Sequence, residues 1–364
     1  MNMHLALLTN APYLDEHLTA FNHLVVGLID EGVRLVQIAP ERVETSELSI
    51  FGDRFNYRES TFTPITRHRI LSLGERLDEL EVSVVMAMHG GLWRYAAELA
   101  KRHDFALVLN AQSGRDVRRL HSVMRLLRPT QTVMLAPTQP ILDALEQELR
   151  GTVQCRLAPP GVHLPGEDAL PQARSEPPAA PCVIVSTTGE LTPEVEAMMR
   201  GLPEVIEAHP EAQFFLDGQS TSQHELWKLA SRLDILSHVS MIPRKLGHRE
   251  LLLKADLFIQ PQAMGAARSL SLQTMAHAIP MIAQDDPWLD YLLENVTCRL
   301  VDQPQPEEWT QLIRRLLGRR DEALQLGRHA RAYVREHHTM SNQVARTLEV
   351  CRRLTGESLA FPAA

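Results

Sequence analysis

Short apolar runs alternate with longer amphipathic segments along both halves of the chain. HLALLT at residues 4–9 is a continuous apolar run, residues 17–30 carry apolar side chains at helical spacing, and VRLVQIA at 33–39 is a second apolar run. Continuous apolar runs are typical of strands buried on both faces, whereas apolar positions three to four residues apart indicate a helix. The pattern predicts a strand–helix–strand unit that opens a parallel sheet.

The same alternation continues to the C-terminus. Strands are predicted wherever a short apolar run is bounded by turn residues, and helices wherever apolar residues recur at helical spacing. The further predicted strands are 82–88, 105–111, 132–137, a short strand that begins near Cys155, 182–188, 212–218, 238–242, 256–261, 280–284 and 298–301. The further predicted helices are 92–103, 117–128, 139–149, 193–209, 222–233, 248–255, 271–278 and 287–295. Two long helices are predicted to finish the chain, and the last of them is 323–338 with its continuation.

A proline-rich stretch separates the two halves. Residues 163–181 contain five prolines and almost no aliphatic pattern, which is typical of a linker. We therefore predict an N-terminal Rossmann-like domain at 1–162, a C-terminal one at 182–340, and a helix and tail at 341–364. The predicted fold class is α/β, with two Rossmann-like domains facing each other across a cleft. Ligands of such sheets bind beyond the carboxyl ends of the strands, so the cleft is the expected site.

Composition narrows the class of protein. The chain has 364 residues and a net charge of −8, which argues against a nucleic-acid groove because phosphate binding requires a basic face. The four cysteines lie far apart and lack the spacing of a zinc site. No segment resembles a signal peptide or a membrane span, so we expect a cytoplasmic protein that could lie at the inner membrane face.

Several motifs in the second half follow a known order. These are APPGVH at 158–163, FFLDGQ at 214–219, SLQTMAHAIPMIA at 271–283 and LGRHARAYVREHHT at 326–339. Together they resemble motifs of the retaining, nucleotide-sugar-dependent glycosyltransferases of the GT-B fold, in the family numbered four. The resemblance implies a nucleotide-sugar donor bound by the C-terminal domain, transfer with retention to an acceptor bound by the N-terminal domain, and no metal or cofactor.

The resemblance also shows where this chain departs from the family. Two family glutamates, eight positions apart, correspond to Gly265 and Gln273, and neither is a carboxylate. Gln273 still offers an amide that can bind ribose hydroxyls, whereas Gly265 has no side chain to offer. The segment at 186–196 lacks the family's Arg and Lys and contains three glutamates instead. PYLDEH at 12–17 stands where the family has a glycine-rich loop.

The remaining loop could still hold a donor. Arg268 could supply the missing cation for the diphosphate, or it could be a solvated loop residue. Backbone N–H groups of Ser269 and Leu270 at a helix start favour anions. The resemblance further implies that Gly218 and Pro243 line the base pocket through their backbones.

His89 in MAMHGG follows a predicted strand, where family members often have a histidine facing the sugar. It could act as a general base or hydrogen-bond donor, or it could cap the helix that begins near Leu92. Asp285-Asp286 is expected to cap a helix at Pro287 rather than to bind a metal. The basic segment at 115–129 is either a solvated helix face or a contact for anionic lipid or an acidic acceptor.

Three functions remain open at this point. The first is a glycosyltransferase, and the second is a catalytically inactive homologue that binds or scaffolds a partner transferase. The third is a nucleotide-sugar epimerase of the same fold, which is disfavoured because the loop lacks acid/base carboxylates.

Overall fold

The computed structural model describes residues 3–41, 50–57, 63–170, 180–218, 223–243 and 251–356. The chain divides into two compact units. Unit 1 comprises Met1–Val162, Gly265–Ser269 and His338–Ala364, and unit 2 comprises His163–Met264 and Leu270–His337. Unit 1 therefore contains a short piece of chain from the middle of the second half, as well as the last helix.

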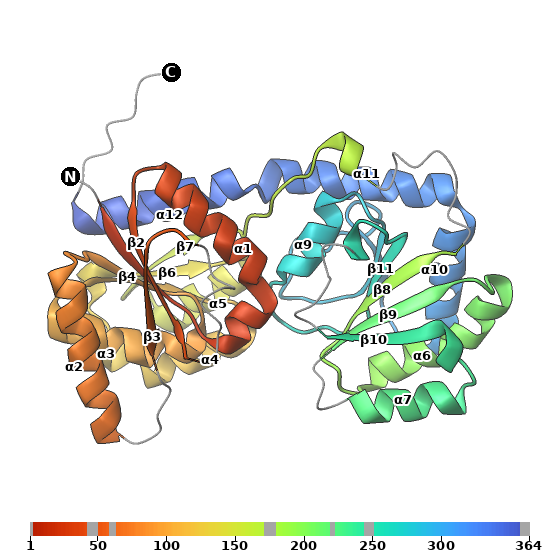
Figure 1. Ribbon diagram of the computed structural model, residues 1–364, viewed down its shortest axis with the longest axis horizontal. Coiled ribbons are helices and arrows are strands. Elements are labelled where there is room, and N and C mark those ends of the chain that lie inside the picture. The colour runs from red at the N-terminus through yellow and green to blue at the C-terminus, as the bar shows by residue number, and fades with distance from the viewer. Residues whose placement is uncertain are drawn as a thin grey trace. The chain divides into compact units, whose positions relative to one another are not determined.

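Unit 1 is built on a parallel sheet whose described strands follow the order of a doubly wound fold (Figure 1). From edge to edge these are β3 (Asp53–Tyr57), β2 (Arg34–Pro40), β1 (His4–Leu8), β4 (Val84–Ala87), β5 (Ala106–Asn110), β6 (Thr132–Ala136) and β7 (Gln154–Leu157). Adjacent strands are parallel in every pair. Every residue of β1, β4, β5 and β6 is buried, as the continuous apolar runs predict.

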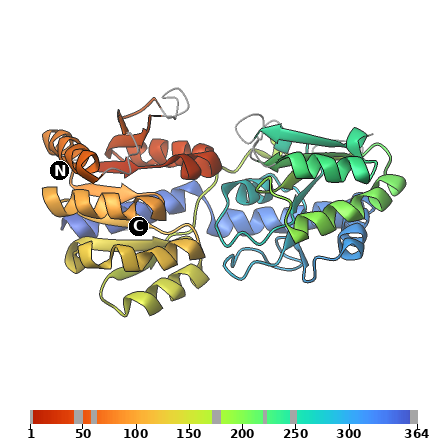
Figure 2. The same ribbon diagram turned by 90° about the horizontal axis from the view of Figure 1, so that it is seen from below.

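Helices cover both faces of this sheet (Figures 1 and 2). One face carries α1 (Ala11–Asp30) and α12 (Met340–Thr355), and the other carries α2 (Thr63–Glu79), α3 (Trp93–His103), α4 (Gly114–Arg119) and α5 (Gln139–Leu149). Right-handed crossovers produce this division, because the chain first moves outward to β3 and then returns to β4 on the other side. α1 buries Phe21, Leu24 and Leu28 against the sheet, each contributing roughly 1.5–3 kcal/mol.

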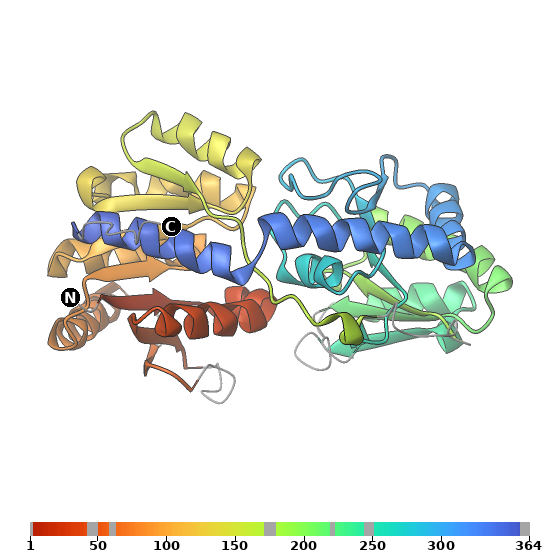
Figure 3. The same cartoon turned by 90° about the horizontal axis from the view of Figure 1, so that it is seen from above.

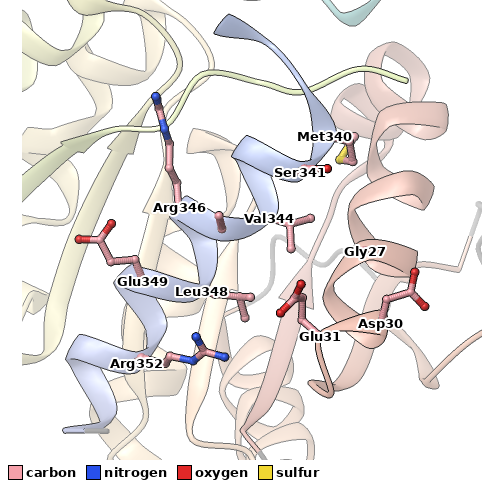
Figure 4. Close-up of a pocket in the computed structure, with 11 residues that line it drawn as sticks. Gly27, Asp30, Glu31, Met340, Ser341, Val344, Arg346, Leu348, Glu349 and Arg352 are labelled. Atoms are coloured by element: carbon pink, nitrogen blue, oxygen red, sulfur yellow. The ribbon is translucent and has the colours of Figure 1, made fainter. Parts of the chain in front are cut away.

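The last helix packs closely on the first (Figures 3 and 4). A Cβ atom on Gly27 would lie 2.7 Å from Cγ2 of Val344, so the glycine allows the two helices to approach. In Figure 4, Val344 and Leu348 point from α12 toward α1, whereas Arg346 points away from it. A groove of about 480 Å³ remains beside this contact.

Residues 160–162 fasten the start of α12 to unit 1. Gly161 donates its N–H to Oε1 of Gln343 at 2.8 Å, and Nδ1 of His338 lies 3.0 Å from the carbonyl oxygen of Pro160. A Cβ on Gly161 would lie 2.6 Å from the carbonyl oxygen of Thr339, so only glycine fits the turn in APPGVH. The helix predicted to continue beyond residue 338 thus belongs to the packing of the first unit.

Unit 2 contains a second parallel sheet of the same design. Its described strands, from edge to edge, are β10 (Val239–Pro243), β9 (Gln213–Gly218), β8 (Cys182–Ser186), β11 (Leu257–Gln260), β12 (Met281–Gln284) and β13 (Arg299–Val301). The helices of this half are α6 (Pro193–Ala208), α7 (Gln223–Arg232), α9 (Ser269–Ala276), α10 (Pro306–Gly318) and α11 (Arg320–His337). The predicted α/β class with two Rossmann-like sheets is confirmed.

Two predicted helices are wrong. Residues 117–128 do not form one amphipathic helix, because α4 ends at Arg119 and 3₁₀ turns follow at Leu120–Ser122 and Met124–Leu126. The buried residues there, Val117, Leu120 and Val123, are spaced by three, which matches the three residues per turn of a 3₁₀ helix.

Residues 287–295 also form turns and no helix. Thr297 explains this, because its Oγ1 donates to the carbonyl of Tyr291 at 2.6 Å and accepts from the N–H of Leu293 at 2.7 Å. Such side-chain bonds compete with the helical ladder. Asp286 therefore caps a turn, with Oδ1 accepting from the N–H of Trp288 at 3.1 Å, and no helix begins at Pro287.

The sequence patterns also missed two elements, β3 and α2. The predicted helix at 248–255 lies largely outside the described residues, and helical residues are described at its Leu251 and Leu252. No helix in the described part of the chain is long and apolar enough to cross a bilayer.

Candidate functional site

The carboxyl edge of the unit 1 sheet brings together polar residues from three strands. Asn10 follows β1, His89 follows β4, and Gln112 and Asp116 follow β5. Asn10 caps α1, with Oδ1 accepting from the N–H of Tyr13 at 3.1 Å. Asp116 is fully buried and accepts from the N–H of Gln112 at 2.9 Å and from Arg119 at 3.0 Å. This edge is where ligands of doubly wound sheets bind.

His89 is held in a defined tautomer at this edge. Its Nδ1 accepts from the N–H of Gly91 at 3.0 Å and lies 3.1 Å from Nδ2 of Asn10. A ring nitrogen that accepts from a backbone N–H carries no proton, so the neutral ring is protonated on Nε2. His89 therefore does cap the turn at Gly90–Leu92, as one of the two sequence interpretations predicts. Because Nε2 carries the proton, the cap is compatible with a role of His89 as a hydrogen-bond donor to a ligand and not as a general base.

Burial lowers the pKa of His89 below its ordinary value of 6.5. The Asp116 carboxylate opposes this shift and the Arg119 guanidinium adds to it. Because the unfolded chain binds the proton more tightly, His89 contributes stability that is complete above pH 6.5. That contribution is lost as the pH falls through the lower folded-state pKa.

We expect an NMR titration of His89 to give a midpoint below 6.5 and nitrogen shifts of the Nε2–H tautomer. A spectrum of His89→Gln assigns the resonances. A midpoint at or above 6.5, or an Nδ1–H tautomer, would contradict this description of the site.

A strap formed by residues 265–269 packs on the same edge of unit 1. Ala266 forms an antiparallel bridge with Ser113. The carbonyl of Gly265 accepts from the N–H of Gly114 at 3.0 Å, and the N–H of Ala267 donates to the carbonyl of Gln112 at 3.0 Å. These backbone bonds explain why the strap belongs to unit 1, although the chain on either side belongs to unit 2.

A buried ion pair completes the attachment of the strap. Nε and Nη2 of Arg268 donate to the two carboxylate oxygens of Glu16 at 2.8 and 3.0 Å, which is a bidentate pair. Oγ of Ser269 donates to the carbonyl of Glu16 at 2.6 Å. The side chain of Arg268 is 2% exposed and that of Glu16 is 16% exposed. Arg268 is therefore not a solvated loop residue, and its phosphate role remains a prediction.

The backbone at Gly265 bears on the first of the two glutamates that the resemblance implies. Its φ of +61° lies in the left-handed region, which disfavours residues with a Cβ. In this conformation a carboxylate at position 265 would be strained, and Glu16 instead supplies a carboxylate to the strap from α1. Sequence reasoning named Glu16 only as a departure from a glycine-rich loop and did not pair it with Arg268.

The remaining predicted donor residues lie in unit 2, at the carboxyl ends of strands or in α9. Gly218 and Pro243 end the neighbouring strands β9 and β10 and are partners in the sheet register. Leu270 is buried in the first turn of α9, and Gln273 is half-buried later in the same helix. Within the described residues, the Gln273 side-chain amide makes no hydrogen bond to the protein.

Gln262 fixes the loop that follows β8 in unit 2. Its Oε1 accepts from the N–H of Thr188 at 3.0 Å, and its Nε2 lies 3.2 Å from Oγ1 of Thr192, the N-cap of α6. The resemblance predicts phosphate-binding Arg and Lys side chains for a loop at this position. Here the backbone is held by a neutral amide and the first turn of α6 carries Glu194 and Glu196.

No cluster of three or more potential metal-ligating His, Cys, Asp or Glu side chains occurs among the described residues. The four cysteines are thiols that form no disulfide, and burial raises the pKa of Cys155, Cys298 and Cys351 to about 12. A thiol with such a pKa is protonated near neutral pH, so these three cysteines are poor nucleophiles.

Comparisons with known proteins agree with this architecture. Residues 183–333 match the family model for glycosyl transferases group 1. No curated protein matches the chain. Among solved structures, the chain is similar to sucrose-phosphate synthase from Thermosynechococcus elongatus, with 15% identity and a TM-score of 0.74 over 98% of this chain and 100% of that one.

Two further solved structures also align with nearly all of this chain. HepE from Anabaena, solved in complex with UDP and glucose, has 12% identity and a TM-score of 0.74 over 96% of this chain and 100% of that one. A glycosyltransferase from Rickettsia africae ESF-5 has 12% identity and a TM-score of 0.72 over 98% of this chain and 100% of that one. The family match thus covers residues 183–333, which is less than half of the chain. The structural neighbours show that the chain has the GT-B fold.

Proposed function

We propose that this protein transfers a sugar from a nucleotide-sugar donor to an acceptor, with retention of anomeric configuration and without a metal ion or cofactor. The observation that carries the proposal is the group 1 glycosyltransferase domain at 183–333. The similarity to HepE, whose structure contains UDP and glucose, supports a uridine nucleotide as a first donor to test.

The proposed donor contacts are those that the resemblance implies for this sequence. The Gln273 amide binds the ribose hydroxyls, and the backbones of Gly218 and Pro243 line the base. The backbone N–H groups of Ser269 and Leu270 bind phosphate. Nε2–H of His89 donates a hydrogen bond to the transferred sugar, because its lowered pKa keeps the ring neutral.

Arg268 can serve the diphosphate only if it shares its guanidinium with Glu16. The bidentate pair already uses Nε and Nη2, so a diphosphate would have to share the guanidinium with the Glu16 carboxylate. The pair also neutralises much of the positive charge that a diphosphate would require. The electrostatic stabilisation of the leaving group would therefore depend strongly on backbone N–H groups.

The Glu16–Arg268 ion pair also favours a second candidate function. This is a catalytically inactive homologue that binds or scaffolds a partner glycosyltransferase. In this case the Glu16–Arg268 pair has a structural role in holding the strap. Glu190, Glu194 and Glu196 add negative charge beside the loop after β8, which disfavours a diphosphate there.

A thermal-shift measurement with UDP, GDP, ADP and their sugar conjugates separates the two candidates. A ligand at about 100 times its dissociation constant stabilises the folded protein by roughly 2.7 kcal/mol. We expect a raised melting temperature with one nucleotide family, lost in Gln273→Ala. Gln325→Ala, at an exposed position of α11, is the matched control and should keep the shift. A folded sample that shifts with no nucleotide would contradict donor binding and favour the inactive homologue.

A further inference from the structure

A second polar pocket lies on unit 1, apart from the residues proposed to bind the donor. Its volume is about 340 Å³, and it lies among the ends of β2 and β3, the middle of α2 and the first turn of α3. This volume is within the range of sites for small ligands. Tyr57, the last residue of β3, connects it to the carboxyl edge of the sheet, because the Tyr57 hydroxyl donates to the carbonyl of Thr9 at 3.0 Å.

One wall of the pocket is a stripe of hydrogen-bond donors on α2. Arg69, Ser72 and Arg76 are spaced by three and four residues, so they lie on one face of the helix. The Arg76 guanidinium stacks over the Phe55 ring with its carbon 4.0 Å from the ring centroid. This contact holds the guanidinium against the ring, and the edge of a guanidinium binds carboxylate or phosphate with good geometry. The two arginines give the stripe a positive charge, whereas the net charge of the whole chain is −8.

The opposite wall is aromatic and fixed in place. The rings of Tyr57 and Tyr95 stack with their centroids 5.8 Å apart and an angle of 29° between their planes. Burial raises the pKa of Tyr95 to about 12, and the Arg69 guanidinium partly opposes this shift. The Tyr95 hydroxyl is therefore neutral and can donate a hydrogen bond.

Glu41 gives the pocket one hydrogen-bond acceptor of opposite charge. Its backbone N–H donates to the carbonyl of Tyr57 at 2.9 Å, which places it at the end of β2 beside the aromatic wall. A carboxylate there can accept hydrogen bonds from sugar hydroxyls. An anion-binding stripe, an aromatic wall and a hydroxyl acceptor in one pocket fit a sugar ring that carries an acidic group.

We propose that this pocket binds the acceptor, and that the acceptor is a saccharide bearing a carboxylate or a phosphate. The role as acceptor site rests on the proposed function, whereas the binding of an acidic saccharide does not. Hydrogen bonds connect the pocket to the candidate site, since Tyr57 is bonded to Thr9 and the next residue, Asn10, contacts His89.

The test is direct binding to the full chain in the absence of nucleotide, measured by ligand-detected NMR. Methyl glucuronide is compared with methyl glucoside, and glucose 6-phosphate with glucose. We expect at least one acidic member to bind about tenfold more tightly than its neutral counterpart, because charge-assisted hydrogen bonds are roughly twice as strong as neutral ones. The two pairs also distinguish a carboxylate from a phosphate.

Variants at the stripe locate the binding. Arg69→Gln and Arg76→Gln should each lower the ratio of acidic-sugar affinity to neutral-sugar affinity by about fivefold or more. Arg102→Gln, at an exposed position of α3 outside the pocket, is the matched control and should bind as the unmodified protein does.

Equal binding of acidic and neutral sugars, no binding of any probe, or an acidic preference that survives both stripe variants would overturn the proposal. Because no nucleotide is present, these results are independent of the thermal-shift experiment. If acidic sugars bind but no nucleotide raises the melting temperature, the proposal for this pocket stands and only the transferase function is contradicted.

Discussion

Replacing Glu16 by glutamine is expected to destabilise the protein by about 3–5 kcal/mol, because it leaves the Arg268 charge buried without its partner. The guanidinium is 2% exposed, so water cannot take the place of the carboxylate. Urea unfolding of Glu16→Gln, Arg268→Met and the double variant measures the effect. The double variant should be less destabilised than the sum of the two single variants, since it removes the unpaired charge.

An exposed ion pair of the same composition provides the control. Glu196 and Arg200 lie one turn apart on α6, with side chains 39% and 51% exposed. Exposed pairs at this spacing contribute about 0.3–0.5 kcal/mol, so Glu196→Gln should cost little. If Glu16→Gln lowers the free energy of unfolding no more than Glu196→Gln does, the Glu16–Arg268 pair does not stabilise the attachment of the strap.

Placing a carboxylate at position 273 is expected to tighten nucleotide binding by roughly two- to thirtyfold. The proposed partners of Gln273 are ribose hydroxyls, and hydrogen bonds to a charged acceptor contribute about 1.5–3 kcal/mol, against about 1 kcal/mol for neutral ones. Gln273→Glu should therefore lower the dissociation constant for the nucleotide that stabilises the protein, and Gln273→Ala should raise it. Isothermal titration with that nucleotide measures both variants.

The same glutamate substitution at Gln325 on α11 controls for the change in net charge. It should leave the dissociation constant within about twofold, because a distant surface charge is screened by salt. Weaker binding by Gln273→Glu than by Gln273→Ala would mean that position 273 does not face the ribose.

Local sequence patterns predicted most of the fold. The continuous apolar runs at β1, β4, β5 and β6 are recognisable because strands buried on both faces need apolar side chains at every position. β3 was missed for the opposite reason. It is the edge strand of its sheet, and DRFNY carries exposed and half-buried side chains with no clear apolar pattern.

Two segments predicted as helices adopt other structures, for reasons that the spacing of apolar residues does not reveal. Residues 117–128 have enough helix-forming residues, but the buried positions recur every three residues and the chain tightens to 3₁₀ turns. Residues 287–295 do not form a helix because the Thr297 hydroxyl hydrogen-bonds the carbonyl of Tyr291 and the N–H of Leu293, two backbone groups that a helix would use.

The candidate site was predicted only in part. The positions of His89, Gly218 and Pro243 at strand ends follow from strand order, because the carboxyl ends of parallel strands share one edge. The tautomer of His89 does not follow from the sequence, since it depends on the N–H of Gly91 and on Asn10, which lies 79 residues away.

The sequence by itself determined two α/β halves, the motifs of a sugar-nucleotide fold, and the absence of carboxylates from residue 261 to residue 283. Only the tertiary structure decided what this loop does. Glu16 and Arg268 are 252 residues apart, so no local sequence pattern predicts that they form an ion pair. Their pairing exists because the backbone bonds of residues 265–267 bring the strap against the first unit, where a buried guanidinium must find a carboxylate.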